Sequence, residues 1–166
     1  MKPLLALLSL LALPVMAAEP TLYGRYEYIT LPELGQTLKA KMDTGAWTAS
    51  LSAKDIEMFT RDGEEWVRFR LATKDADGKV YEHQVSRISK IKGRADEDEE
   101  GDAPEISKRP VVDLEMCLGG EKRTMEVNLV DRSNFNYPLL VGSKALRQFK
   151  AAVNPAKRFT AGKPEC

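Results

Sequence analysis

Three consecutive residues, Asp43, Thr44 and Gly45, form the stretch of this sequence best suited to acid–base chemistry. A carboxylate on a tight turn can project into a cleft and act as a general base on water, and glycine permits the close backbone approach that such a turn needs. Amide hydrolysis by this route requires a second carboxylate, because two carboxyl groups in contact share one proton: one activates water and the other polarises the carbonyl. The question is therefore where the partner of Asp43 lies.

The sequence contains one Asp-Thr-Gly and no Asp-Ser-Gly, so one copy of the chain cannot supply two equivalent turns. Two copies related by a two-fold axis can, because Asp43 then meets its own symmetry mate. We therefore expect a homodimer, or weakly associating monomers, with the Asp43 turns facing each other. The hydroxyl group of Thr44 would then bridge the two turns.

Short β-strands are expected to position this turn, because apolar and polar residues alternate with a period of two in several stretches. One such stretch, from Leu38 to Met42, leads straight into Asp43. Alternation or strand-forming composition predicts further strands over residues 23–29, 67–71, 81–85, 112–118 and 125–129. Asp-Gly pairs at 62–63 and 77–78 and Gly-Gly at 119–120 are the turn signals between them.

The end of the chain combines strand and helix signals. The stretch "YPLLVG", residues 137–142, predicts a wholly apolar strand, and Ser143 is expected to cap a short helix over "KALRQFK". A last strand is predicted within residues 153–159. Many short strands with little helix predict an all-β domain that is closed or sandwiched.

Residues 96–105 contain the acidic run "DEDEEGD" followed by proline. Like charges repel and cannot be buried together, so this stretch is predicted to be a flexible solvated loop. Cation binding is the alternative, but the stretch lacks the ligand spacing of an EF-hand loop.

Residues 1–17 have the features of a signal peptide. Lys2 supplies a positive start, residues 4–13 are nearly all apolar, and "VMA" ending at Ala17 has the form of a cleavage site. An uncleaved membrane anchor is the alternative, although the apolar run is short for a permanent span. Residues 18–166 are therefore expected to form a single periplasmic or secreted domain that has no membrane partner after cleavage.

Charge and cysteine content narrow the function further. Basic and acidic residues balance at 25 each, which disfavours a nucleic-acid partner. The two cysteines, Cys117 and Cys166, are expected to form a disulfide in an oxidising compartment. A buried thiol with a loose terminal one is the alternative.

The context of the Asp43 turn resembles the retropepsin-like aspartic peptidases, in which Asp-Thr-Gly-Ala comes early in a half-barrel and a hydrophobic-hydrophobic-glycine strand comes late. The stretches "AKMDTGAWTASLSA", "EEWVRFRL", "KRPVVDLEMCLGGE" and "VNLVDRSNFNYPLLVGSKAL" follow the order of a bacterial single-domain branch that is often labelled an ATP-dependent zinc protease. The resemblance covers nearly the whole chain after residue 17. It implies an all-β, retropepsin-like closed β-barrel, one acid-protease half, with one short C-terminal helix.

The resemblance also implies roles for individual residues. The catalytic turn would consist of Asp43, Thr44 and Gly45. Ala46 would complete the turn and contact the substrate. By its position immediately past the turn, Trp47 is expected to line a substrate pocket or the dimer seam; packing in the core is the alternative. A supporting strand would contain Leu140, Val141 and Gly142. Three positions that flank the turn depart from the branch, which usually has arginine, histidine and arginine where this chain has Trp47, Ser52 and Ser143.

The zinc and ATP parts of that label are not supported by the residues. A catalytic zinc ion normally takes about three ligands that include histidines, whereas this chain has one histidine, His83, and no His-Glu-x-x-His. There is no Gly-x-x-x-x-Gly-Lys-Ser/Thr phosphate loop. We therefore expect no cofactor and no metal, and we expect His83 to be a surface or packing residue.

Three functions remain open from the sequence: a homodimeric aspartic endopeptidase acting on peptides or proteins, a silent relative that binds an extended peptide as an added strand, and, ranked last, a metallopeptidase. The first predicts hydrolysis without a covalent intermediate and with an acidic pH optimum. The hairpin over residues 66–85 is expected to form the flap over the cleft.

Overall fold

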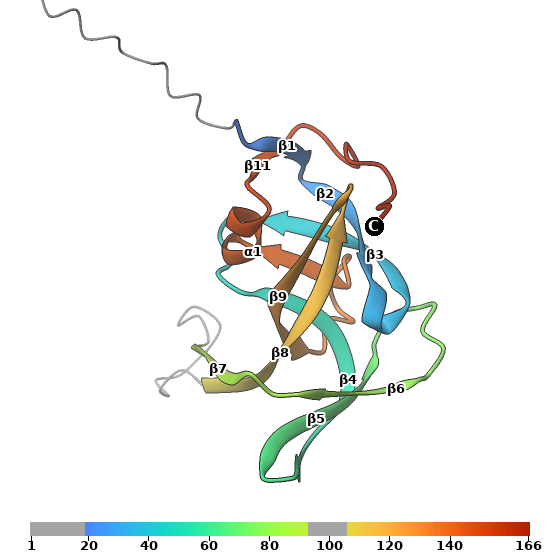
Figure 1. The fold of residues 1–166 in the computed structure, drawn as a ribbon, viewed down its shortest axis with the longest axis vertical. Coiled ribbons are helices and arrows are strands. Elements are labelled where there is room, and N and C mark those ends of the chain that lie inside the picture. Colours follow the sequence, from blue (N-terminus) through green and yellow to red (C-terminus); the bar gives the residue numbers. More distant parts are fainter. Residues whose placement is uncertain (1–18, 93–105) are drawn as a thin grey trace, which may run out of the picture.

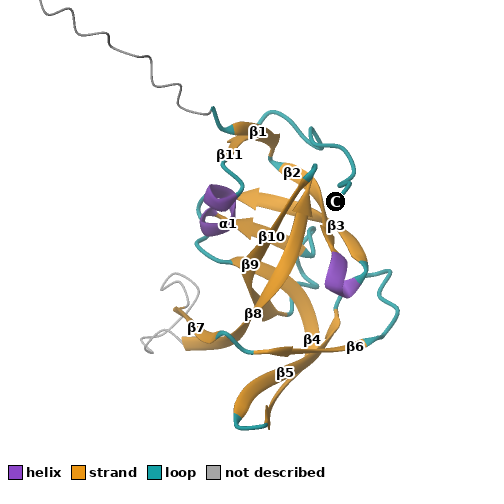
Figure 2. Cartoon of the chain, in the orientation of Figure 1, coloured by secondary structure: helices purple, strands orange, loops and turns teal. Residues whose placement is uncertain are grey.

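The computed structural model describes residues 19–92 and 106–166 of the chain (Figure 1). The signal peptide predicted over residues 1–17 and the whole acidic loop predicted over residues 96–105 lie outside these described residues and stay predictions. What is described is mostly β-strand, with one short α-helix and one 3-10 helix (Figure 2). Neither helix has the length and apolar character that a membrane span requires.

The elements follow one another along the chain with mostly short connections. They are β1 (Thr21–Gly24), β2 (Tyr26–Leu31), η1 (Pro32–Leu34), β3 (Gln36–Asp43), β4 (Ala49–Arg61), β5 (Glu64–Leu71), β6 (Val80–Gln84), β7 (Arg87–Lys92), β8 (Ile106–Leu118), β9 (Glu121–Val130), β10 (Leu139–Gly142), α1 (Ser143–Gln148) and β11 (Ala151–Asn154).

Six strands close into a mixed barrel in the order β10-β3-β2-β8-β9-β4, because β10 also pairs with β4. The predicted all-β closed barrel with one short C-terminal helix is therefore confirmed. Alternate residues of these strands are buried and form the core, as the period-two pattern predicts; among them are Ile29, Leu51, Leu114, Val127, Leu129 and Leu139. Full burial of each such side chain contributes about 1.5–3 kcal/mol to folding.

Strand β10 is wedged between the strand that enters the Asp43 turn and the strand that leaves it. It runs parallel to β3, with Gly142 opposite Asp43, and antiparallel to β4, with Leu140 opposite Ser50. Residue 142 must be glycine, because a Cβ atom there would lie 2.7 Å from the carbonyl oxygen of Trp47. This close approach lets β10 support both sides of the turn.

Three local predictions need correction. The strand predicted over residues 23–29 is divided into β1 and β2, with a break at Arg25. The last strand begins and ends earlier than residues 153–159 predicted, because β11 follows α1 closely and pairs in parallel with β1. Ser143 is not the cap of α1 but its first residue; Gly142 occupies the N-cap position, where no side chain caps the helix.

The C-terminal segment is fastened to the barrel at two places. The disulfide between Cys117 and Cys166, whose Cα atoms are 6.0 Å apart, confirms the predicted pairing and ties the chain end to β8. The fully buried carboxylate of Glu27 accepts hydrogen bonds from the amides of Gly24, Thr160 and Ala161 and from the Thr160 hydroxyl group. This inward-facing role of Glu27 was not predicted.

Candidate active site

Asp43 is the last residue of β3, and its carboxylate is held by the turn that follows. Oδ1 accepts a hydrogen bond from the amide of Gly45 at 3.0 Å, and Oδ2 lies 2.9 Å from Nζ of Lys41. Burial acts to raise the pKa of the Asp43 carboxyl group, but the hydrogen bonds from Lys41 and from the amides of Gly45 and Ala46 outweigh it. The net pKa lies below the ordinary value, so Asp43 is ionised in the single chain at neutral pH.

The start of α1 fixes the far side of the turn. The amide of Ser143 donates to the carbonyl of Ala46 at 2.7 Å, and the amide of Lys144 donates to that of Trp47 at 3.1 Å. The first amides of a helix have no partner within the helix, so these two bonds satisfy both the helix end and the turn. The backbone of residues 43–47 is therefore held by β3, β10 and α1 together.

The side chains on the outer face of the turn are open to solvent in the single chain. Thr44 and Gly45 are exposed, and the Trp47 side chain is 57% exposed. The guanidinium group of Arg147 lies 4.8 Å from the centre of the Trp47 ring. An exposed tryptophan beside an exposed turn is a surface that a partner or substrate can cover.

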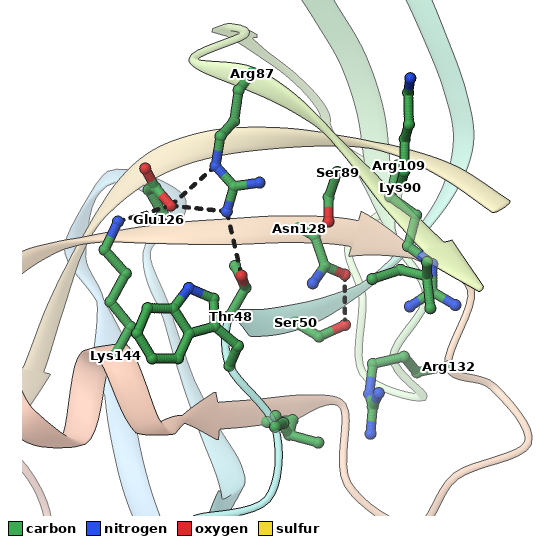
Figure 3. Close-up of a pocket in the computed structure, with 14 residues that line it drawn as sticks. Thr48, Ser50, Arg87, Ser89, Lys90, Arg109, Glu126, Asn128, Arg132 and Lys144 are labelled. Atoms are coloured by element: carbon green, nitrogen blue, oxygen red, sulfur yellow. Dashed lines mark hydrogen bonds and ion pairs between the residues drawn. The ribbon is translucent and has the colours of Figure 1, made fainter. Parts of the chain in front are cut away.

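A cavity of about 560 Å³ lies beside the turn (Figure 3). Ala46 and Trp47 form part of its wall, whereas Asp43 itself does not line it. The rest of the wall comes from β4, β7, β8, β9, β10, the start of α1 and the residues just before β4 and just after β9. These wall residues are Thr48, Ser50, Arg87, Ser89, Lys90, Ile91, Arg109, Glu126, Asn128, Arg132, Leu140 and Lys144.

The hairpin over residues 66–85, which is expected to form the flap, does not line this cavity. β5 pairs with residues 53–61 of β4, well past the turn, and β6 continues the sheet outward from β5. β7 and β8, which pair with each other, supply the wall instead. The order of strands along the chain could not show which strands line the cavity. β4 is long, and the part of it that pairs with β5 lies well past the turn.

The cavity is basic, and this was not predicted. Five cationic side chains line it, against one acidic side chain, Glu126. The Glu126 carboxylate pairs with Arg87 at 2.8 Å and with Lys144 at 2.9 Å, and Arg87 also reaches Thr48 (Figure 3). The hydrogen bond from Arg87 has the largest effect on the pKa of Glu126 and lowers it. Burial acts to raise this pKa, but the hydrogen bond from Lys144 lowers it further, and the net pKa lies below the ordinary value.

Lys90, Arg109 and Arg132 form no ion pair within the described part of the chain. Burial lowers the pKa of both arginines; for Arg132, the neighbouring Arg109 lowers it further and Asp43 acts in the opposite direction. This end of the cavity therefore carries positive charge that no ion pair among the described residues compensates.

A family model described as the retropepsin-like aspartic endopeptidase RimB matches residues 22–164. The chain belongs to the RimB-like family. The resemblance read from the sequence is thereby confirmed, and so is the assignment to a family named for aspartic endopeptidase activity.

Similar proteins include probable alpha-L-glutamate ligases. The protein from Shewanella halifaxensis is 32% identical over 148 residues, which cover 89% of this chain and 31% of that relative. The protein from Desulfotalea psychrophila is 31% identical over 143 residues, which cover 84% of this chain and 29% of that relative. The chain thus spans about a third of the length of these relatives. A crystal structure of Lpg0085 from Legionella pneumophila, described as of unknown function, is 38% identical, with a TM-score of 0.68, and covers 84% of this chain and 97% of the other.

Two further residues of this RimB-like chain have clear structural surroundings. His83, on β6, lies 3.8 Å from the Glu33 carboxylate and packs beside Phe69, and burial lowers its pKa against the effect of Glu33. Ser52 is fully buried, and its hydroxyl group accepts the Arg132 amide and donates to the Ala72 carbonyl. Over residues 19–92 and 106–166, no cluster of three or more His, Cys, Asp or Glu side chains could hold a metal ion.

Proposed function

We propose that this protein is an aspartic endopeptidase that works as a homodimer, in which two Asp43 carboxylates hold and activate one water molecule. The observation that carries the proposal is the position of Asp43, at the end of β3 on a turn held by β10 and α1. The turn exposes Thr44 and Gly45, which leaves space for the same turn of a second copy.

In such a pair one carboxylate would be ionised and the other protonated. The ionised group would remove a proton from water as the water oxygen attacks the peptide carbonyl carbon, while the protonated group donates a hydrogen bond to the carbonyl oxygen. The resulting tetrahedral intermediate would break its carbon–nitrogen bond as the nitrogen takes up a proton. One free carboxyl end and one free amine result, and no covalent bond to the enzyme forms.

The ion pair between Lys41 and Asp43 sets a condition for this mechanism. A proton can be shared only if the second carboxylate takes the place of Lys41 beside Oδ2. The Lys41 side chain is 49% exposed and can turn into solvent. We therefore expect dimerisation and proton uptake to be linked, so that association and cleavage both increase towards acidic pH.

We further propose that the substrate is an acidic peptide or protein segment. The cavity beside the turn supports this, because its cations outnumber its single carboxylate. The names of the similar proteins agree with it, since a glutamate ligase makes products that carry added carboxylates. Electrostatic attraction of this kind favours both binding and the choice of substrate.

A silent module that binds an acidic peptide without cleaving it is the second candidate. The Lys41–Asp43 ion pair favours it, because a lysine that stays in place would keep both carboxylates ionised. Asp43→Asn separates the two functions: it should abolish cleavage and leave peptide binding largely unchanged. Asp113→Asn, an exposed carboxylate on β8 outside the cavity, is the matched control.

The test combines sedimentation with hydrolysis of a mixed peptide library between pH 4 and 7, with and without chelator. We expect a dimer at acidic pH and cleavage by the wild type and Asp113→Asn but not by Asp43→Asn. Full activity of Asp43→Asn would refute the proposed mechanism. Loss of activity with chelator and rescue by zinc would instead establish the metallopeptidase.

We also propose that the protein is exported to the periplasm or secreted. The Cys117–Cys166 disulfide supports this, because structural disulfides persist in oxidising compartments. Cell fractionation and intact-mass measurement without reductant should find a chain that begins at residue 18 and has no alkylatable thiol. An unprocessed cytosolic chain would contradict the proposal.

A further inference from the structure

Arg132 is a buried cation whose charge is not compensated. The residue is only 8% exposed, and its Nε atom has no hydrogen-bond partner among the described residues. A charged donor that is buried without a partner destabilises the fold, so buried arginines are almost always paired. Arg132 lines the cavity, so an acidic ligand bound there can supply the missing acceptor.

The surrounding structure holds Arg132 in place. Its amide donates to the buried hydroxyl group of Ser52 at 3.1 Å, and its carbonyl accepts the amide of Phe135 at 2.8 Å. Its guanidinium group lies 4.5 Å from the centre of the Phe135 ring. The two hydrogen bonds fix the backbone of Arg132, and the Phe135 ring packs against its guanidinium group without neutralising the charge. Arg132 is therefore held beside the cavity with its charge available to an anion.

Two further donors lie at the same end of the cavity. Arg109, on β8, lines the cavity and is close enough to Arg132 to disfavour its charge. Asn128, on β9, accepts the Ser50 hydroxyl group on its Oδ1 atom at 2.9 Å, which leaves its NH₂ group free to donate (Figure 3). Two neighbouring guanidinium groups and one amide form a set of donors that suits a carboxylate.

The other end of the same cavity does not have this property. There Glu126 already pairs with both Arg87 and Lys144. Arg87 and Lys144 thus each have a carboxylate partner, whereas Arg109 and Arg132 have no ion-pair partner among the described residues.

We propose that Arg132 and Arg109 bind one carboxylate side chain of the substrate close to the scissile bond and so select glutamate or aspartate over their amides at that position. The inference rests on the proposed peptidase function and adds to it a specificity site. The bound carboxylate would accept hydrogen bonds from both guanidinium groups and relieve their mutual repulsion.

The experiment compares two peptides that differ by a single glutamate-to-glutamine change. Hydrolysis is measured with the wild type, Arg132→Gln, Arg132→Lys and Arg109→Gln, and binding is measured by calorimetry with the same changes placed in Asp43→Asn. Arg123→Gln is the matched control, since Arg123 pairs with Glu121 on an exposed part of β9 outside the cavity. Thermal unfolding of each variant is recorded in parallel.

We expect the wild type to favour the glutamate peptide about ten- to hundredfold in kcat/KM and in affinity. Arg132→Gln and Arg109→Gln should each lose most of this preference while treating the glutamine peptide much as the wild type does, and Arg132→Lys should retain part of it. Arg132→Gln should not lower the melting temperature, because it removes an unpaired buried charge. Arg123→Gln should behave as the wild type does.

Equal losses for both peptides, a lowered melting temperature with unchanged preference, or no preference in the wild type would overturn the inference. If Arg132→Gln fails to fold, Arg109→Gln decides it by the same comparison. Failure of the proposed function is seen separately: discrimination in binding without any hydrolysis would support the carboxylate site and count against the peptidase. Hydrolysis of both peptides without discrimination would support the peptidase and count against the carboxylate site.

Discussion

Replacing Gly142 with alanine tests whether β10 supports the Asp43 turn. The added Cβ atom would lie 2.7 Å from the Trp47 carbonyl oxygen and 2.8 Å from the carbonyl carbon and oxygen of Thr48. All of these are backbone atoms of the segment between the turn and β4, so no side chain can move aside. We expect a destabilisation of about 3 kcal/mol, the upper end for an overpacked site. For a chain of this size that corresponds to a melting temperature lower by roughly 6–12 °C.

The assay is thermal unfolding followed by circular dichroism, with Gly120→Ala as the matched control. Residue 120 lies in the β8–β9 turn, where an added Cβ would meet nothing within 4 Å, so its melting temperature should change little. Gly142→Ala should also lose more cleavage than its unfolded fraction explains, because the turn would be displaced while the barrel persists. A Gly142→Ala protein as stable as Gly120→Ala would refute the close packing of β10 against residues 47 and 48.

Two further predictions concern stability. Cys166→Ser, which opens a loop with a sequence separation of 49 residues, should cost roughly 4 kcal/mol in denaturant unfolding without reductant, and a loss below about 1 kcal/mol would show that the bond does not restrain the unfolded chain. Glu126 has a pKa below its ordinary value of 4.5, so its pairing with Arg87 and Lys144 stabilises the fold above that pH and is lost as the pH falls through the lowered pKa. Glu126→Gln should therefore be less stable than the wild type at neutral pH and should approach it at strongly acidic pH; a constant difference across this range would contradict the assignment.

Several features of this protein could be predicted from short stretches of sequence. The strand leading into Asp43, the Gly119-Gly120 turn and the apolar strand ending at Gly142 are encoded by alternation and turn residues within a few positions of each other. The disulfide could be predicted because the sequence contains two cysteines, Cys117 and Cys166. Local signals failed at the start of α1. Serine is a common N-cap residue, so the sequence suggests Ser143 as the cap, but Gly142 occupies the N-cap position.

The basic cavity was decided by the tertiary structure alone. Arg87, Arg109 and Arg132 are separated by more than twenty residues from one another in sequence, and each lies in a stretch that reads as an ordinary solvated strand or loop. Closing the barrel through β10 and β4, and pairing β7 with β8, brings them to one wall. The burial of Glu27 has the same origin, since its four hydrogen-bond donors come partly from residues 160 and 161 at the other end of the chain. A sequence pattern determines which way a side chain faces on its own strand, whereas strand register and barrel closure decide which other side chains it meets.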